Sequence, residues 1–190
     1  NNTVNIEGTG TTVTGLISGG NRSEENTLNV RGTATATNLE NFNRVTFALG
    51  AVRAGSTMLT LTDAAGTDAS GWDDTVAIDT DAEGAASTWG SRWTLMENAN
   101  GINLTRFTAG DRVQGDYEYT LGKSGDATHD TTTVYADGYR FRNNTAEYNE
   151  TTAHDIVWGG RSEKGNTVEN NTLTVSGGSI TNTAHSAAVH

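Results

Sequence analysis

Short stretches in which apolar and polar residues alternate recur along the chain, each opened by an asparagine and closed by a glycine. The clearest two are residues 3–6 and 27–30, and Gly8 and Gly32 follow them after one intervening residue. Alternation with a period of two is typical of β-strands, because successive side chains point to opposite faces. The pattern therefore predicts strands whose apolar side chains share one face.

The stretches belong to a longer phrase, which consists of a short apolar run, a Gly-Gly turn, a polar loop, an asparagine and an alternating strand. It occupies residues 16–32 and 156–180, and residues 2–8 are a truncated copy. Asn2 and Asn26 lie 24 residues apart. A coil of three strands of about five residues with three short turns needs about that length. The recurrence predicts the stacked coils of a β-solenoid.

Stacking at this spacing makes two specific predictions. Val4 and Ile6 should lie in one interior column with Leu28 and Val30, since alternation places each pair on one face. The asparagines at the turns should form a ladder, because stacked amide side chains can hydrogen-bond to one another.

The rest of the chain favours the same all-β class. Density of glycine and β-branched residues disfavours helices. Further strand patterns occupy residues 42–49, 58–62, 89–96, 112–121, 131–135 and 139–142. Residues 63–83 carry seven acids and no Lys or Arg, which indicates an insertion or an excursion from the stack. We therefore expect solenoid coils over 1–62, an acidic, Trp-containing insertion over 63–100, and resumed coils over 101–190.

Charge excludes some partners. The chain has 12 Lys and Arg against 23 Asp and Glu, a net charge of −11. This balance argues against nucleic acid and anionic lipid, which both require basic side chains. No apolar run approaches the roughly 20 residues that span a bilayer, so we expect no membrane insertion of this fragment. The chain starts and ends within its repeated phrase, and we expect it to be a piece of a larger protein.

Three stretches carry a resemblance to a known family. The phrase at residues 159–178, with its Gly-Gly turns around Asn-Thr-Leu-Thr-Val, resembles the passenger repeats of Gram-negative autotransporter adhesins. Residues 39–49 followed by 54–62, and residues 110–121, are similar to strands of the same passengers. The motifs consist of turn and strand residues, which any β-solenoid could reuse.

The resemblance implies a right-handed β-helix (β-solenoid) stalk, exported across the outer membrane by a separate barrel and displayed at the cell surface or secreted. It also implies a non-catalytic cell-adhesion role, with attachment to host or neighbouring cells, biofilm and virulence. The partners would be host-surface or bacterial-surface proteins or glycans, or further copies of the chain. Residues 63–100 depart from the family pattern and are either an insertion or a local hairpin or sandwich. For the fold class as a whole, the alternative to the β-solenoid is a β-sandwich.

Two loops are the expected contact surfaces, within residues 63–100 and 122–131. Tryptophans in or beside the first of them predict a ligand-binding platform, because indole rings stack on sugars. The candidates are Trp72, Trp89 and Trp93, and the last two are four residues apart on one strand face. The alternative is that these rings fill the core.

The acidic block is the one metal-like cluster, and its members are Asp73, Asp74, Asp79, Asp81 and Glu83. The last three match the first half of a calcium loop, but Gly90 stands where the twelfth-position Glu belongs. A solvated acidic loop is therefore favoured, with an irregular Ca²⁺ site as the alternative and no other cofactor. The four aspartates could also serve a β-helix polysaccharide lyase or glycoside hydrolase, the alternative function. A hydrolase would need two carboxyl groups about 5 to 9 Å apart.

Overall fold

We describe the protein from a computed structural model. It describes residues 1–21, 23–52, 54–72, 76–79, 92–149, 153–154 and 157–180. Within these ranges the chain is all-β, as the alternation predicts, and the helical element there is one short 3-10 turn, η1 (Leu49–Ala51). No helix in the described ranges is long and apolar enough to cross a membrane.

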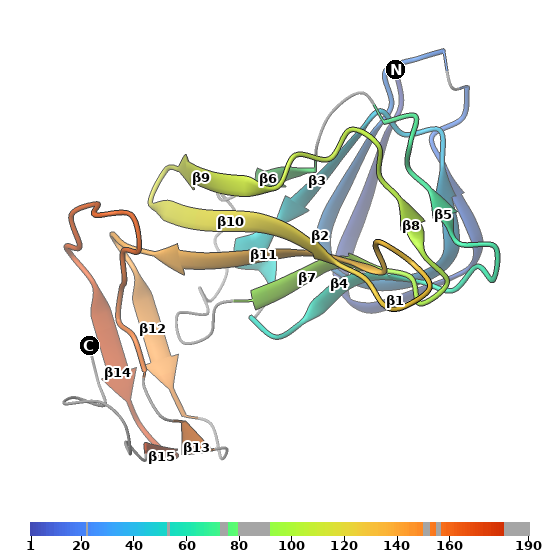
Figure 1. Cartoon of the computed structure of the whole chain (residues 1–190). Helices are drawn as coiled ribbons and strands as arrows, with labels where there is room; N and C mark the ends of the chain where they lie inside the picture. The colour runs from blue at the N-terminus through green and yellow to red at the C-terminus, as the bar shows by residue number, and fades with distance from the viewer. Residues whose placement is uncertain are drawn as a thin grey trace.

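The strands of the described ranges are β1 (Thr3–Ser18), β2 (Thr27–Glu40), β3 (Arg44–Ala48), β4 (Thr57–Leu61), β5 (Thr67–Asp68), β6 (Ala77–Asp79), β7 (Arg92–Glu97), β8 (Ile102–Asn103), β9 (Gly110–Gln114), β10 (Tyr117–Ser124), β11 (Thr133–Arg140), β12 (Thr145–Tyr148), β13 (Ala153–His154), β14 (Thr172–Val175) and β15 (Ser179–Ile180). The largest sheet has the order β6-β3-β2-β4-β7-β11-β10-β9, with β1 also paired to β2, and it curls into a half-barrel (Figure 1). The pairs β5–β8, β12–β14 and β13–β15 are separate small sheets.

The first repeat has the register that the sequence predicts. β1 and β2 run parallel, with Val4 beside Leu28 and Ile6 beside Val30. Leu28 and Val30 are fully buried and Ile6 is nearly so. The offset of 24 residues is therefore the offset between neighbouring strands, and the predicted apolar column is confirmed.

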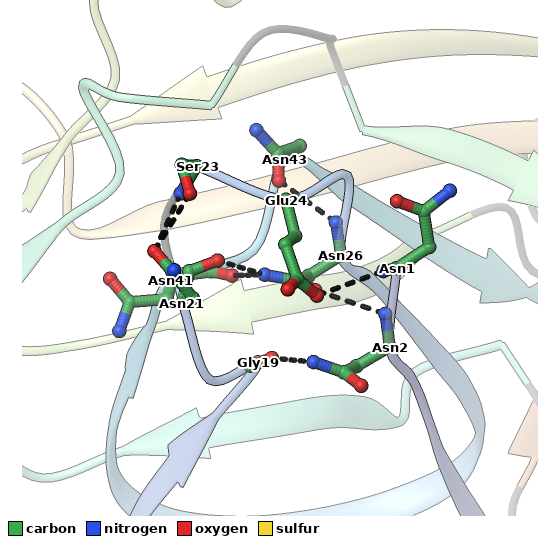
Figure 2. A network of polar contacts seen from close by, with 9 residues as sticks. All are labelled: Asn1, Asn2, Gly19, Asn21, Ser23, Glu24, Asn26, Asn41 and Asn43. Atoms are coloured by element: carbon green, nitrogen blue, oxygen red, sulfur yellow. Dashed lines mark hydrogen bonds and ion pairs between the residues drawn. The ribbon is translucent and has the colours of Figure 1, made fainter.

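The asparagine ladder is also present, as Figure 2 shows. The backbone N–H of Asn2 donates to Oδ1 of Asn26 at 3.0 Å, and the backbone N–H of Asn26 donates to Oδ1 of Asn43 at 2.9 Å. Nδ2 of the buried Asn26 donates to the carbonyls of Asn21 and Asn41. The ladder thus differs in detail from the prediction. Each side chain satisfies backbone groups at the corner, where a buried N–H without an acceptor would be costly.

Two further asparagine pairs repeat the theme. Asn29 Nδ2 donates to Asn5 Oδ1 at 2.8 Å, an amide-to-amide bond, but these two asparagines lie within β1 and β2 and not at the turns where the sequence predicts such bonds. In the C-terminal half, the backbone N–H of Asn144 donates to Oδ1 of Asn171 at 3.0 Å, beside the parallel pair β12–β14. The corner bond thus recurs in two separate parts of the chain.

The chain turns a corner between β3 and β4. These two strands do not pair with each other; β3 lies parallel to the first half of β2, and β4 lies parallel to the second half. The next strands repeat this arrangement, because β6 pairs with β3, β7 with β4 and β8 with β5, all parallel. The described part of residues 63–100 therefore continues the parallel pairing, and the division of the chain at residues 63 and 101 stays a prediction.

Antiparallel strands complete the large sheet. β11 pairs with β7, β10 with β11 and β9 with β10. The alternating run 112–121 is two strands, because Gly115, with φ of +56°, and Asp116 form the two-residue turn of a hairpin. Conversely, the patterns at 131–135 and 139–142 contribute to one strand, β11. A period of two is common to parallel and antiparallel strands, so the sequence pattern did not indicate the direction.

Candidate functional site

A polar groove of about 710 Å³ lies beside the parallel pair β5–β8. Three segments line it, at residues 65–68, 100–105 and 128–131, and Lys123 on β10 adds a cationic side chain. The expected contact loops, within 63–100 and 122–131, both contribute to this groove.

Two glycines allow the floor of the groove to form. Gly66 has φ of +79°, and a Cβ there would lie 2.8 Å from the carbonyl oxygen of Asn100. Gly101 has φ of +98°, and a Cβ there would lie 2.8 Å from Cδ2 of His129. Both positions need a left-handed backbone and close approach, which glycine provides without strain. The His129 ring therefore packs directly on the backbone of the β5–β8 floor.

The loop that carries His129 is held by a local carboxylate. Asp126 Oδ1 accepts the backbone N–H groups of Thr128 at 2.7 Å and His129 at 2.8 Å. These bonds, that of Thr128 first, hold the pKa of Asp126 below its usual value. The backbone N–H of Ile102 donates to the carbonyl of Thr131 at 2.7 Å, which fastens the loop to β8. These hydrogen bonds hold the loop in place along one side of the groove.

The lining is suited to hydrogen bonding. Its side chains are mainly hydroxyls, amides and carboxylates, among them Asp68, Asn103, Thr105 and Asp130, and Lys123 is exposed. Pockets for apolar small molecules are lined mostly by hydrophobic and aromatic side chains, and this groove lacks that character. The arrangement can bind a polar, hydroxyl-rich or amide-rich ligand along an open surface.

Compared with known proteins, the chain matches no family model, no curated protein and no solved structure.

The tryptophans predicted as a platform lie elsewhere. Trp72 is 5% exposed and Trp93 is 2% exposed, and both belong to the main hydrophobic core. Trp93 Nε1 donates to the carbonyl of Val52 at 3.0 Å, which satisfies the one polar atom of a buried indole. Neither ring offers a face to solvent, in line with the core-filling alternative. Trp89 lies outside the described residues.

Of the acids predicted as a metal cluster, Asp79 is described. It lies on β6, and its Oδ2 is 3.1 Å from Nη1 of Arg31 on β2. Asp73, Asp74, Asp81 and Glu83 lie outside the described residues. No group of three or more potential metal ligands occurs within the described ranges, and the calcium alternative stays a prediction.

Sequence reasoning missed one buried carboxylate. Glu118 is 1% exposed between Tyr117 and Tyr119 on β10. Burial raises the pKa of its carboxyl group, but hydrogen bonds from the 162–166 loop outweigh burial, so this pKa lies below the usual value. An acid in the middle of an alternating apolar strand is the signal that could have found it. Its role is structural, since it fastens this loop to the large sheet.

Proposed function

We propose that this chain is a non-catalytic segment of a bacterial cell-surface adhesin, exported across the outer membrane, in which successive parallel strands are coils of a right-handed β-solenoid. The observation that carries the proposal is the in-register parallel pairing with a ladder of corner asparagines. Such pairing satisfies backbone groups from coil to coil and gives a stiff support. It suits a stalk that presents binding surfaces away from a cell.

The polar groove is the recognition surface in this proposal. Its lining of amides, hydroxyls and carboxylates favours a glycan on a host or neighbouring bacterial cell, bound along an open face. The proposed work is attachment, with biofilm formation as its consequence. The acidic composition is compatible with a secreted, solvated surface.

Binding to cells tests the adhesive role. Fluorescently labelled protein is applied to cultured epithelial cells, to Gram-negative cells and to an array of surface glycans. We expect saturable binding. Lys123→Glu, which reverses a charge, and Thr128→Arg, which fills the groove, should each reduce the affinity at least about tenfold, which corresponds to about 1.4 kcal/mol. Arg112→Glu on β9 makes the same charge change away from the groove lining and should leave binding intact.

Two results would contradict the proposal. Absence of saturable binding to every surface would remove the adhesive role, and equal binding by the groove variants and the wild type would remove the groove as its site. Cleavage of a glycan during incubation would support the enzymatic alternative instead. Solution scattering separately tests the solenoid, for which an elongated particle is expected and a compact sphere would argue against it.

A further inference from the structure

The imidazole ring of His129 is held in one orientation at the side of the groove. Its Nδ1 is buried and lies 3.4 Å from Oδ1 of Asp126. Its Cδ2 edge packs against the backbone of Gly101, where a Cβ would lie 2.8 Å from Cδ2. The side chain is nevertheless 35% exposed, and it lines the groove. With Nδ1 and the Cδ2 edge covered, Nε2 and Cε1 are the ring atoms that face the groove.

Asp126 determines which ring nitrogen carries the proton. Its Oδ1 accepts the backbone N–H groups of Thr128 and His129, and these bonds, that of Thr128 first, hold the pKa of its carboxyl group below the usual value. The group is therefore ionised near neutral pH and can only accept hydrogen bonds. A carboxylate beside Nδ1 favours the neutral imidazole that has its proton on Nδ1. Nε2 then has a lone pair and is a hydrogen-bond acceptor on the groove side.

The charges in the groove limit the kind of ligand. Of the residues that line it, Asp68 and Asp130 carry carboxylates and Lys123 carries an ammonium group, so the lining has an excess of negative charge. Carboxylates and Nε2 of such an imidazole accept hydrogen bonds, and like charges that meet across an interface are unfavourable. The groove therefore suits a ligand that presents hydroxyl donors and carries no carboxylate.

Further polar groups are already held in place on and beside β5 and β8. Asp68 and Asn103 are partners in the parallel register, with Asn103 Nδ2 3.4 Å from Asp68 Oδ1. Thr105 Oγ1 donates to the carbonyl of Ser70 at 3.0 Å. Side chains that are ordered before binding lose little freedom on binding, which favours affinity. The groove thus offers several positioned polar groups to a ligand with several hydroxyls.

We propose that Nε2 of His129 accepts a hydrogen bond from a sugar hydroxyl and that the groove selects neutral glycans over glycans that carry carboxylates. This inference rests on the proposed adhesive function and deepens it, since it names the ligand class and the residue that recognises it. His129 contacts the sugar directly, and Asp126 is the positioning residue behind it. Lys123 supplies a donor that complements these acceptors, for a ring or glycosidic oxygen of the same ligand.

Two substitutions separate the acceptor atom from the ring. His129→Phe keeps a flat ring against Gly101 but removes both nitrogens, whereas His129→Gln keeps an acceptor atom in the side chain. The probes are neutral oligosaccharides of galactose and N-acetylglucosamine, each compared with the same oligosaccharide capped by sialic acid. The neutral probes should bind His129→Phe about three- to tenfold more weakly than the wild type, and His129→Gln within about twofold of it, the effect of one neutral hydrogen bond. Thermal melting of the three proteins checks that each one folds.

Nitrogen NMR of the imidazoles tests the orientation of His129 without a ligand. The signals of its ring are assigned by their absence from the spectrum of His129→Gln. At about pH 8, where free imidazoles are neutral, the proton should lie on Nδ1 and Nε2 should carry none. Addition of a neutral probe should then shift the Nε2 signal of the wild type, and this measurement decides the matter if His129→Phe melts early.

The outcomes distinguish this inference from the adhesive proposal. A wild type that binds none of the cells or glycans contradicts both. Groove-dependent binding that is unchanged in His129→Phe, or that favours the sialylated probes over the neutral ones, overturns this inference and leaves the adhesive role intact. A free protein in which Nε2 of His129 carries the proton, or an Nε2 signal that does not respond to a bound neutral probe, overturns it as well.

Discussion

Replacing Glu118 with alanine should release the 162–166 loop from the large sheet. The carboxylate accepts four hydrogen bonds from this loop. They come from Ser162 Oγ at 2.5 Å, the backbone N–H groups of Glu163 at 2.6 Å and Lys164 at 2.9 Å, and Asn166 Nδ2 at 2.6 Å. Alanine leaves these four donors without their shared acceptor.

The expected loss of unfolding free energy depends on how far water can reach into the loop. A buried donor left without a partner costs about 1–3 kcal/mol, so the two backbone N–H groups alone could cost about 2–6 kcal/mol. Glu163 and Lys164 are themselves exposed, however, and their N–H groups can bond to water once the loop opens. Hydration places the expected loss of unfolding free energy near the lower end, about 2–3 kcal/mol.

Urea unfolding followed by tryptophan fluorescence measures this loss. Glu147→Ala is the matched control, since its exposed carboxylate accepts a bond from Ser176 Oγ at 2.6 Å and truncation should change stability by about 0.5 kcal/mol or less. Trypsin should also cut after Lys164 faster in Glu118→Ala than in the wild type. A loss below about 1 kcal/mol, with unchanged proteolysis, would refute the reasoning.

Three further perturbations test the fold. The pKa of Glu118 is lowered, so its contribution to stability is complete above the unfolded value of about 4.3 and disappears as pH falls through the folded value; acid should lower the urea midpoint less in Glu118→Ala. Asn26→Ala should cost about 2–4 kcal/mol in urea unfolding, because backbone partners of a buried side chain lose their bonds, whereas exposed Asn5→Ala should cost under about 1 kcal/mol. Gly32→Ala should expose β1 to hydrogen exchange, since a Cβ would lie 1.6 Å from the carbonyl oxygen of Gly8.

The features that the sequence predicts correctly are those repeated at a fixed spacing. The 24-residue interval between Asn2 and Asn26 becomes the register of β1 on β2, and Val4 and Ile6 lie beside the expected partners. In stacked parallel strands, equivalent residues of successive repeats lie side by side, so a repeat in the sequence predicts a column of equivalent side chains. The same logic identifies the corner ladder, although not the atoms that bond.

The features that the sequence does not predict depend on contacts between unlike segments. The groove joins β5, β8 and the loop around His129, which share no pattern that indicates their proximity. Trp93 is buried because Val52 supplies a carbonyl to its indole, and nothing in a local stretch reveals that partner. The local sequence around a buried tryptophan does not differ from that around a tryptophan exposed on a binding face.

The two copies of the repeated phrase show how one pattern acquires two functions. After the first Gly-Gly turn, Asn21 Oδ1 accepts the backbone N–H and the hydroxyl of Ser23, so the loop supplies its own acceptor. After the second turn the corresponding residue is Arg161, whose side chain contains no acceptor atom. The hydroxyl of Ser162 instead donates a hydrogen bond to the carboxylate of Glu118. Because that acceptor lies on β10, this bond fastens the second loop to the sheet. A substitution within a repeat thereby converts a local turn into a tertiary attachment, and this attachment joins the C-terminal parallel strands to the half-barrel.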